Sequence, residues 1–146
     1  VWIATVFNID WPKANHYGNP DLMKADLIAY FDACKTANLN SVCFQVRPMC
    51  DAFYKSSYEP WSSYLSGSRG TDPGWDPLAF AVQEAHKRGL RIDAWVNPYR
   101  YSRHQNSHGL VSHGAMQKMQ KHASTYSPME GSVSLTLPRS GQSTEL

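Results

Sequence analysis

One local signal occurs twice in this chain, and each copy marks the start of an amphipathic helix. Asn19-Pro20 and Asp76-Pro77 each place a capping side chain before a proline at the first helical position. After each pair, apolar residues recur every three or four positions, which predicts helices over residues 21–37 and 77–88. Each predicted helix is followed by a residue suited to the left-handed conformation that ends a helix, Asn38 and Gly89 respectively.

Short runs of β-branched and aromatic residues alternate with these helices. They cover residues 2–7, 41–46 and 91–96 and predict strands. The order β-α-β-α-β implies parallel strands joined by right-handed crossovers, and therefore an α/β fold. The helix-to-strand connections are very short and the strand-to-helix connections are long. This asymmetry is typical of a barrel or doubly wound sheet whose functional face lies at the carboxyl ends of the strands.

Large polar side chains stand where the second and third predicted strands end. The two segments read LNSVCFQVRP (39–48) and LRIDAWVNPYR (90–100). Packing alone does not explain such side chains at the end of an apolar strand, and α/β barrels handle substrate at this edge. The side chains concerned are those of Gln45, Arg47, Asn97, Tyr99 and Arg100.

The composition excludes some classes of function. The net charge of +2 on 146 residues is too small and too scattered to indicate nucleic acid, whose backbone is bound by clustered Lys and Arg. No stretch approaches the roughly 18 apolar residues of a membrane span. Because the chain opens within a predicted strand and without Met, we expect the native protein to extend further, with any signal peptide outside this sequence.

The cysteines are odd in number and form no CxxC pair. Cys34 falls on a helix face and Cys43 within a strand, where cysteine commonly packs as a small apolar residue. Cys50 lies in a polar loop and is the cysteine that we would test for reactivity. The set indicates structural cysteines rather than a zinc site or a catalytic thiol.

The segment over residues 49–75 is unusually long for a connection and unusually aromatic. Its rings could stack on sugars or bases, or they could pack on one another as a core private to the loop; both interpretations stay open. The aromatic residues are Phe53, Tyr54, Tyr58, Trp61, Tyr64 and Trp75.

The pattern weakens beyond Tyr101. His104, His108 and His113 recur in a segment rich in Gly, Ser and Asn that fixes no common face, so we expect no metal site. Residues 132–137 alternate as a strand would.

From Ser124 onward the composition shifts to Ser, Thr, Pro and Gly. We therefore divide the chain into a partial barrel over residues 1–123 and a poorly specified tail over residues 124–146. Our hypothesis is that the tail comes from a truncated or frame-shifted gene.

Four segments of the chain resemble one known family. VWIATVFNIDWP, LNSVCFQVRP, GTDPGWDPLAFAVQEAHKRG and LRIDAWVNPYR are similar to the N-terminal part of the glycosyl-hydrolase-like 10 family, over residues 1–101. The resemblance implies a (β/α)₈ barrel, of which this chain holds the first three strands and two helices. It also implies a bacterial protein of the periplasm, cell envelope or exterior, exported or lipid-anchored. The implied substrates are glycans, with peptidoglycan strands among those that members cleave, and we expect no cofactor.

The resemblance also implies which residues bind the glycan. The arginines can fork onto hydroxyls or carboxylates, the amides can donate and accept, and the tyrosine offers a ring face. Trp95 also falls on a family position, although strand alternation allows it to be core. An alternative for Arg47 is a salt bridge to Asp51 or Asp10 that holds the rim together. The expected substrate-binding residues are Asn8, Gln45, Arg47, Asp51, Asn97, Tyr99 and Arg100.

Catalytic residues stay unknown from the sequence. Glycoside hydrolysis commonly uses two carboxylates, about 5 Å or about 6.5–9.5 Å apart. The resemblance places the family's acidic residues on later strands, and nothing of that kind occurs from Met116 onward. Asp93 lies in the middle of the third predicted strand, where we expect it to need a partner such as an arginine of a neighbouring strand.

Two hypotheses of function follow. The first is a fragment of a glycan hydrolase that carries part of the substrate cleft and lacks the catalytic acids. The second is a non-catalytic carbohydrate-binding module that uses the aromatic loop and the polar rim. Nucleotide or phosphosugar binding is weaker, because no Gly-rich loop leads from the first strand into the helix.

Overall fold

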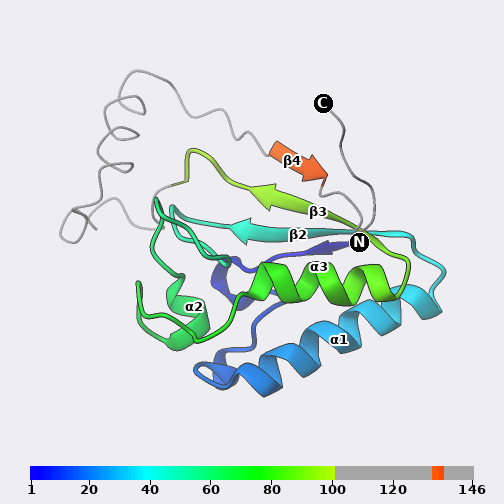
Figure 1. The fold of residues 1–146 in the computed structure, drawn as a ribbon, viewed down its shortest axis with the longest axis horizontal. Helices are drawn as coiled ribbons and strands as arrows, with labels where there is room; N and C mark the ends of the chain where they lie inside the picture. Colours follow the sequence, from blue (N-terminus) through cyan, green and yellow to red (C-terminus); the bar gives the residue numbers. More distant parts are fainter. Residues whose placement is uncertain (101–132, 137–146) are drawn as a thin grey trace.

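The computed structural model describes residues 1–100 and 133–136. Three parallel strands, β1 (Trp2–Ile3), β2 (Ser41–Arg47) and β3 (Arg91–Val96), lie side by side in chain order. A fourth strand, β4 (Val133–Thr136), pairs antiparallel with β3, within the residues 132–137 expected to alternate. Figure 1 shows the sheet with the helices on one side of it. The predicted α/β class is confirmed.

The two predicted helices begin directly after the predicted capping residues, Asn19 and Asp76. α1 (Pro20–Thr36) begins after Asn19, whose side chain accepts a hydrogen bond from the amide of Leu22. α3 (Pro77–Lys87) begins after Asp76, which accepts from the amide of Ala79 in the same way. Beyond the two helices, Asn38 and Gly89 have φ of 54° and 71°, so both take the predicted left-handed conformation.

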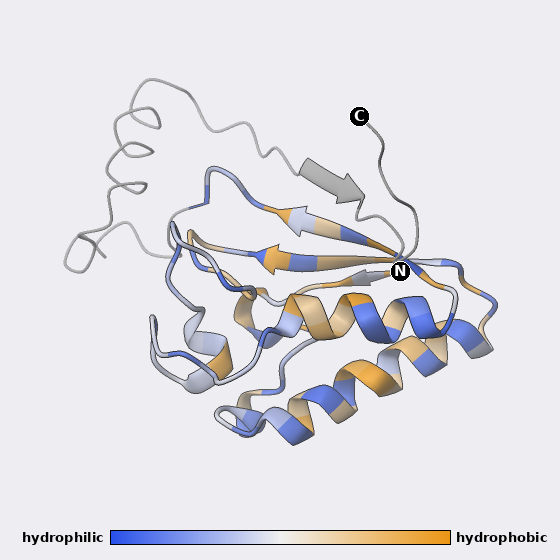
Figure 2. Cartoon of the chain, in the orientation of Figure 1, coloured by the Kyte–Doolittle hydropathy of each residue, from blue (hydrophilic) through white to orange (hydrophobic). Residues whose placement is uncertain are grey.

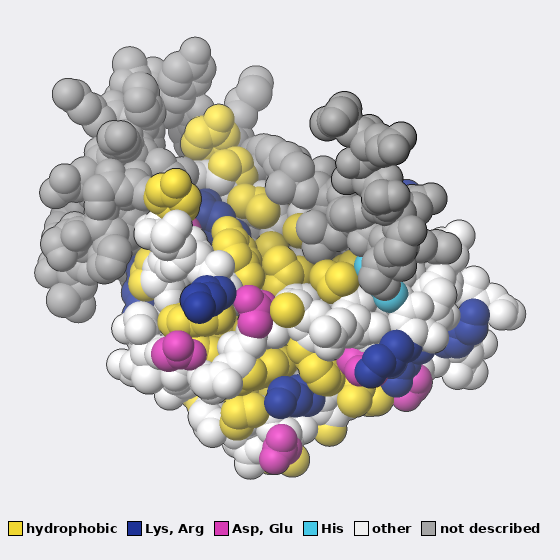
Figure 3. All heavy atoms as spheres, in the orientation of Figure 1, with side chains coloured by type: hydrophobic (Ala, Val, Ile, Leu, Met, Phe, Trp, Pro, Cys, Tyr) yellow, Lys and Arg dark blue, Asp and Glu magenta, His cyan; other side chains and the backbone are white. Residues whose placement is uncertain are grey.

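The core lies between the sheet and these helices. Figure 2 shows apolar and polar residues alternating along α1 and α3, as expected of helices with one buried face. Over the face drawn in Figure 3, hydrophobic side chains occupy much of the middle, and Lys and Arg are interspersed with Asp and Glu among them. The largest fully buried core side chains are Ile3, Trp11, Met23, Leu27, Phe31, Phe44, Phe53, Leu65, Leu90 and Ile92.

β1 is shorter than the sequence predicted, since we expected a strand over residues 2–7. Beyond Ile3 the chain turns into a short 3₁₀ segment, η1 (Val6–Asn8). Here side chains take the place of a neighbouring strand: Asp10 accepts from the amide of Ala4, and Gln45 accepts from the amides of Thr5 and Val6. Because these amides are already satisfied, the backbone leaves the ladder without leaving buried donors unpaired.

Trp11 fixes the connection between β1 and α1 to the core. Its ring is fully buried and meets Phe44 and Phe53 at centroid distances of 5.5 and 5.7 Å. Its indole N–H donates to the carbonyl of Met23 in α1 at 2.9 Å. A second short 3₁₀ segment, η2 (Ala14–His16), completes this connection. The loop after β1 therefore leaves the sheet in a defined direction.

The connection over residues 49–75 folds mainly upon itself and the sheet. It contains one short helix, α2 (Ser63–Ser66), and a parallel bridge between Ala52 and Trp61. Phe53 is fully buried, and four of the other rings are half-buried against the core: Tyr54, Trp61, Tyr64 and Trp75. These five rings therefore belong to, or pack against, the core between the sheet and the helices, and the expected core private to the loop is replaced by this shared one. Tyr58 is the exception, at 72% exposed.

Candidate functional site

The carboxyl ends of β1, β2 and β3 meet at one edge of the sheet, because neighbouring parallel strands point the same way. At this edge the pairing of β2 with β3 slips by one residue between Gln45 and Arg47. Such a bulge re-aims the side chains beside it and is frequent next to functional sites. Here it places Gln45 and Arg47 where both contact Asn97, just beyond the end of β3.

Gln45 is completely buried and bonded at both ends of its amide. Its Oε1 accepts from the amides of Thr5 and Val6, each at 2.9 Å. Its Nε2 donates to Oδ1 of Asn97 at 2.6 Å. This one side chain therefore joins the ends of all three parallel strands. Its partners are protein groups, so it acts as a part of the frame beneath the edge.

Arg47 is also part of this frame. Its Nε and Nη2 donate to Oε1 of Glu59 at 3.0 and 2.6 Å, and its Nη1 donates to the carbonyl of Asn97 at 2.7 Å. Both side chains of the ion pair are more than nine-tenths buried. We expected a salt bridge to Asp51 or Asp10 as the alternative to glycan binding. The bridge exists, but its partner is Glu59, which the long loop brings back to the end of β2.

Asp51 holds the start of the long loop. It is 3% exposed, and it accepts a hydrogen bond from the amide of Met49 at 2.9 Å and another from the side chain of Ser62. Burial raises the pKa of the Asp51 carboxyl above its ordinary value. Because its oxygens accept hydrogen bonds from Met49 and Ser62 of the loop, Asp51 stabilises the loop beneath the strand ends.

Cys50, the cysteine that we would test for reactivity, belongs to the same buried layer. It is 1% exposed, and its Sγ receives a hydrogen bond from Nη2 of Arg47 at 3.2 Å. Burial raises the pKa of the Cys50 thiol, which disfavours the reactive thiolate. Cys34 is buried as well, whereas Cys43 on β2 is half-buried.

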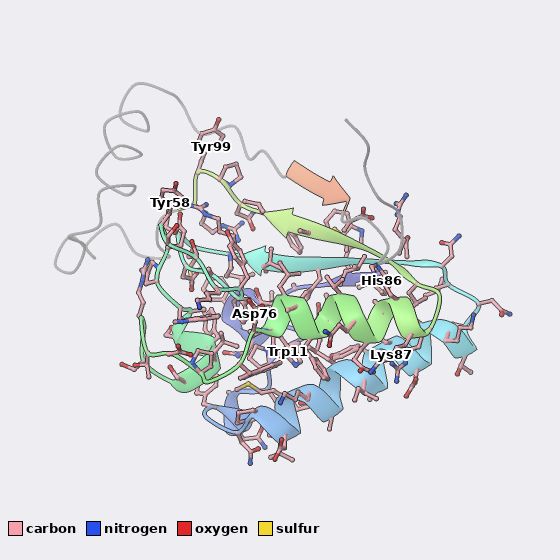
Figure 4. All side chains as sticks on the ribbon, in the orientation of Figure 1. Trp11, Tyr58, Asp76, His86, Lys87 and Tyr99 are labelled. Atoms are coloured by element: carbon pink, nitrogen blue, oxygen red, sulfur yellow. The ribbon has the colours of Figure 1, made fainter. Side chains whose placement is uncertain are left out.

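The remaining expected residues lie nearer the surface. Asn8 is half-buried, and its side chain donates to the carbonyl of Pro12 and accepts from the hydroxyl of Tyr17. Tyr99 is 66% exposed, and Arg100 is half-buried. In Figure 4, Tyr99 and Tyr58 both lie toward the end of the sheet to which the strand arrows point. The edge therefore has exposed tyrosine rings above a buried polar frame.

Two residues of β3 lie on the face of the strand opposite to Ile92 and Ala94, which belong to the core. Trp95 is half-buried and meets Trp2 edge-to-face at a centroid distance of 5.1 Å. Asp93 is 6% exposed and pairs with Arg91 at 3.0 Å. The arginine of this ion pair thus lies on the same strand as Asp93, and a partner from a neighbouring strand stays a prediction.

Glu59 is the functional candidate that the sequence reasoning missed. It lies in the middle of an irregular loop, so no helical or strand period relates it to Arg47, 12 residues earlier. The only available signal was a carboxylate and a proline between aromatic residues, in the segment YEPW. That signal gives no direction in space, and only the folded loop shows which cation the carboxylate meets.

Among the residues that the structure describes, no three His, Cys, Asp or Glu side chains gather as a metal site. His104, His108 and His113 lie outside those residues, as does most of the tail over 124–146. In the same described part of the chain, no helix has the length and apolar character needed to cross a bilayer.

Known proteins are similar to this chain in sequence. The profile of the family described as glycosyl hydrolase-like 10 matches residues 1–136. Glycosyl hydrolase YngK of Bacillus subtilis (strain 168) is 49% identical over 100 residues, which are 68% of this chain and 19% of YngK. Glycosyl hydrolase DigH of Escherichia coli (strain K12) is 40% identical over 108 residues, which are 70% of this chain and 25% of DigH.

The chain thus spans about a fifth to a quarter of the length of these curated relatives. Its parallel β1-α1-β2-α3-β3 arrangement is the N-terminal portion of a (β/α)₈ barrel. On the profile match and these identities, the chain belongs to the glycosyl hydrolase-like 10 family.

Proposed function

We propose that this chain supplies one wall of the glycan-binding cleft of a glycoside hydrolase, and that the catalytic acids lie outside it. The observation that carries the proposal is the layered edge of the sheet. Exposed tyrosines stand above side chains that are fixed by protein hydrogen bonds. Sugars bind well to such edges, because an aromatic ring can cover the apolar face of a pyranose while polar groups meet its hydroxyls.

The described carboxylates support the second half of the proposal. Asp51 and Glu59 are carboxylates of the strand-end layer whose side chains are buried and bonded to protein groups, and the half-buried Asp10 beyond β1 is bonded to the amide of Ala4. Hydrolysis needs one acid that can donate a proton to the leaving group and a second carboxylate across the scissile bond. Neither Asp51 nor Glu59 is placed on an open surface for that work. We therefore assign this chain to binding and assign the bond cleavage to acids elsewhere in the protein.

The substrate that we propose is a bacterial cell-wall or other polysaccharide glycan. The support is that the relatives are glycosyl hydrolases, together with the exposed tyrosines Tyr58 and Tyr99 at the edge. A polymer of this kind lies outside the cytoplasmic membrane. We accordingly propose a periplasmic, cell-envelope or extracellular location.

Binding by this chain can be measured directly. The 146-residue chain is titrated with a soluble hexamer of β-1,4-linked N-acetylglucosamine and incubated with insoluble peptidoglycan, while released reducing ends are counted. Binding without cleavage is the expected result. Measured cleavage would contradict the assignment of the acids, and absence of binding to both materials would contradict the proposed function.

Variants test the tyrosines separately from the fold. One ring face covering about 60 Å² of sugar, at about 25 cal/mol per Å², contributes roughly 1.5 kcal/mol, or about tenfold in Kd. Tyr58→Ala and Tyr99→Ala should each weaken binding by about that factor. Leu39→Ala is the matched control, because Leu39 is 42% exposed but precedes β2 at the opposite edge of the sheet. Equal affinity in all three variants would remove the tyrosines from the site.

A non-catalytic carbohydrate-binding module remains the second candidate. The observation that favours it is the one given above, that the carboxylates of the strand-end layer are buried and engaged. The two candidates differ in the longer protein. A hydrolase requires that protein to release reducing ends, whereas a binding module requires only retention of the glycan.

A further inference from the structure

Phe7 is an aromatic side chain that the fold leaves exposed at the carboxyl end of β1. It lies in η1, just beyond the strand, and it is 44% exposed. The two residues before it, Thr5 and Val6, are buried, and both donate their amide N–H to Gln45. Phe7 therefore lies where the chain leaves the buried frame of the edge and meets solvent.

The backbone of Phe7 is in the left-handed region, with φ of 57° and ψ of 19°. Asn8 follows it with φ of 55°. Asparagine tolerates this region, whereas a bulky side chain such as that of phenylalanine is an outlier in it. Such conformations persist only where the surrounding structure fixes them, and they cluster at active sites and ligand clamps. The conformation of Phe7 therefore calls for an explanation.

Hydrogen bonds on both sides of Phe7 hold this conformation. The amides of Asn8 and Ile9 donate to the carbonyls of Thr5 and Val6, each at 3.2 Å. The side chain of Asn8 is bonded at both ends of its amide within the same connection. The ring is thus presented to solvent by a backbone that is already ordered. A ligand that meets it loses little further backbone entropy.

An exposed aromatic ring follows each of the three parallel strands. Phe7 follows β1, Tyr58 lies in the connection after β2, and Tyr99 follows β3. Because neighbouring strands lie about 4.8 Å apart, the ends of β1 and β3 are separated by about 10 Å. A ligand that contacts all three rings must therefore extend across the edge of the sheet, as a chain of several sugars does.

We propose that the ring of Phe7 contacts the bound glycan, and that the glycan lies across the ends of β1, β2 and β3. The proposal rests on the proposed function and makes it more specific, since the substrate is then an extended chain of sugars. Phenylalanine has no polar group on its side chain, so it covers the apolar face of a pyranose without requiring a hydrogen bond.

The test replaces Phe7 with glycine or tyrosine in the full 146-residue chain. Glycine adopts positive φ without strain, so Phe7→Gly removes the ring and relieves the backbone. Phe7→Tyr keeps a ring face. Ile9→Ala is the matched control, because Ile9 is an apolar residue of the same connection, 64% exposed and without a ring. Calorimetry gives Kd for the N-acetylglucosamine hexamer and for the corresponding disaccharide, and thermal unfolding gives Tm.

We expect Phe7→Gly to weaken hexamer binding by about tenfold, the factor for one ring face, with a Tm no lower than that of the wild type. Phe7→Tyr and Ile9→Ala should bind the hexamer as the wild type does. The wild type should bind the disaccharide less tightly than the hexamer, because a disaccharide is too short to cover the three rings.

Two results would overturn this inference while the proposed function stands. One is an unchanged affinity of Phe7→Gly for the hexamer, or an equal loss in Ile9→Ala. The other is equal affinity of the wild type for the hexamer and the disaccharide, which contradicts the extended arrangement. If the wild type binds no hexamer, this inference is overturned, and the proposed function is overturned with it only if insoluble peptidoglycan is not bound either.

A second measurement needs no variant and covers a Phe7→Gly chain that fails to fold. Nuclear Overhauser effects between the ring protons of Phe7 and the sugar protons are recorded in the wild type at saturating hexamer. We expect them to be present. Their absence, while Tyr58 or Tyr99 shows such contacts, would overturn the inference.

Discussion

Replacing Gln45 with leucine should destabilise the chain more than any change at an exposed strand-end residue. Leucine fills a similar volume but offers no acceptor to the amides of Thr5 and Val6, which are 0% and 6% exposed. Each buried N–H left without a partner costs about 1–3 kcal/mol. The two amides together give about 2–6 kcal/mol, before the lost bond to Asn97 is counted.

A loss of that size is large beside the stability of an ordinary domain, about 5–15 kcal/mol. At roughly 4–8 °C per kcal/mol for a folded unit of this size, the Tm should fall by about 10 °C or more. Thermal unfolding followed by circular dichroism measures it. Gln83→Leu is the matched control, because the same chemical change is made at an exposed position of α3 and should stay within about 0.5 kcal/mol. Equal Tm values for the two variants would refute the reasoning.

Two further predictions concern the buried layer. A brief maleimide pulse on the native chain should label the half-buried Cys43 before the buried Cys34 and Cys50. Peptide mass spectrometry identifies the labelled cysteine, and labelling of Cys50 first would contradict its burial. Burial raises the pKa of Asp51, so the stability that this group contributes is present below the ordinary value near 4 and is lost as pH rises through the raised pKa. Asp51→Asn should therefore gain in Tm relative to wild type between pH 3 and pH 7, and a constant difference would contradict this.

The sequence predicted the fold where short-range chemistry decides it. The caps at Asn19 and Asp76 and the left-handed residues Asn38 and Gly89 act within a few residues of the helix ends, so their effect can be read locally. The end of β1 could not be predicted in this way. It depends on Gln45, which lies about 40 residues away in sequence and replaces the ladder bonds of Thr5 and Val6.

The sequence indicated where the candidate site lies, but it did not indicate which of its side chains face solvent and which are bonded to protein groups. Polar residues at strand ends predicted that their side chains gather at one edge, since parallel strands end together, and Gln45, Arg47 and Asn97 do meet there. Whether such a side chain meets solvent or protein depends on loops with no period. Glu59 reaches Arg47 through one of them, and it turns an expected ligand contact into part of the frame.

We propose that glycan binds at the carboxyl ends of β1, β2 and β3, on exposed side chains above a fixed polar layer. Amide chemical shifts of the isotope-labelled chain, recorded as the N-acetylglucosamine hexamer is added, test it most directly. We expect shifts gathered around Asn8, Tyr58 and Tyr99, with the solvent faces of α1 and α3 unchanged. Shifts confined to those helices, or no shifts at saturating hexamer, would contradict it.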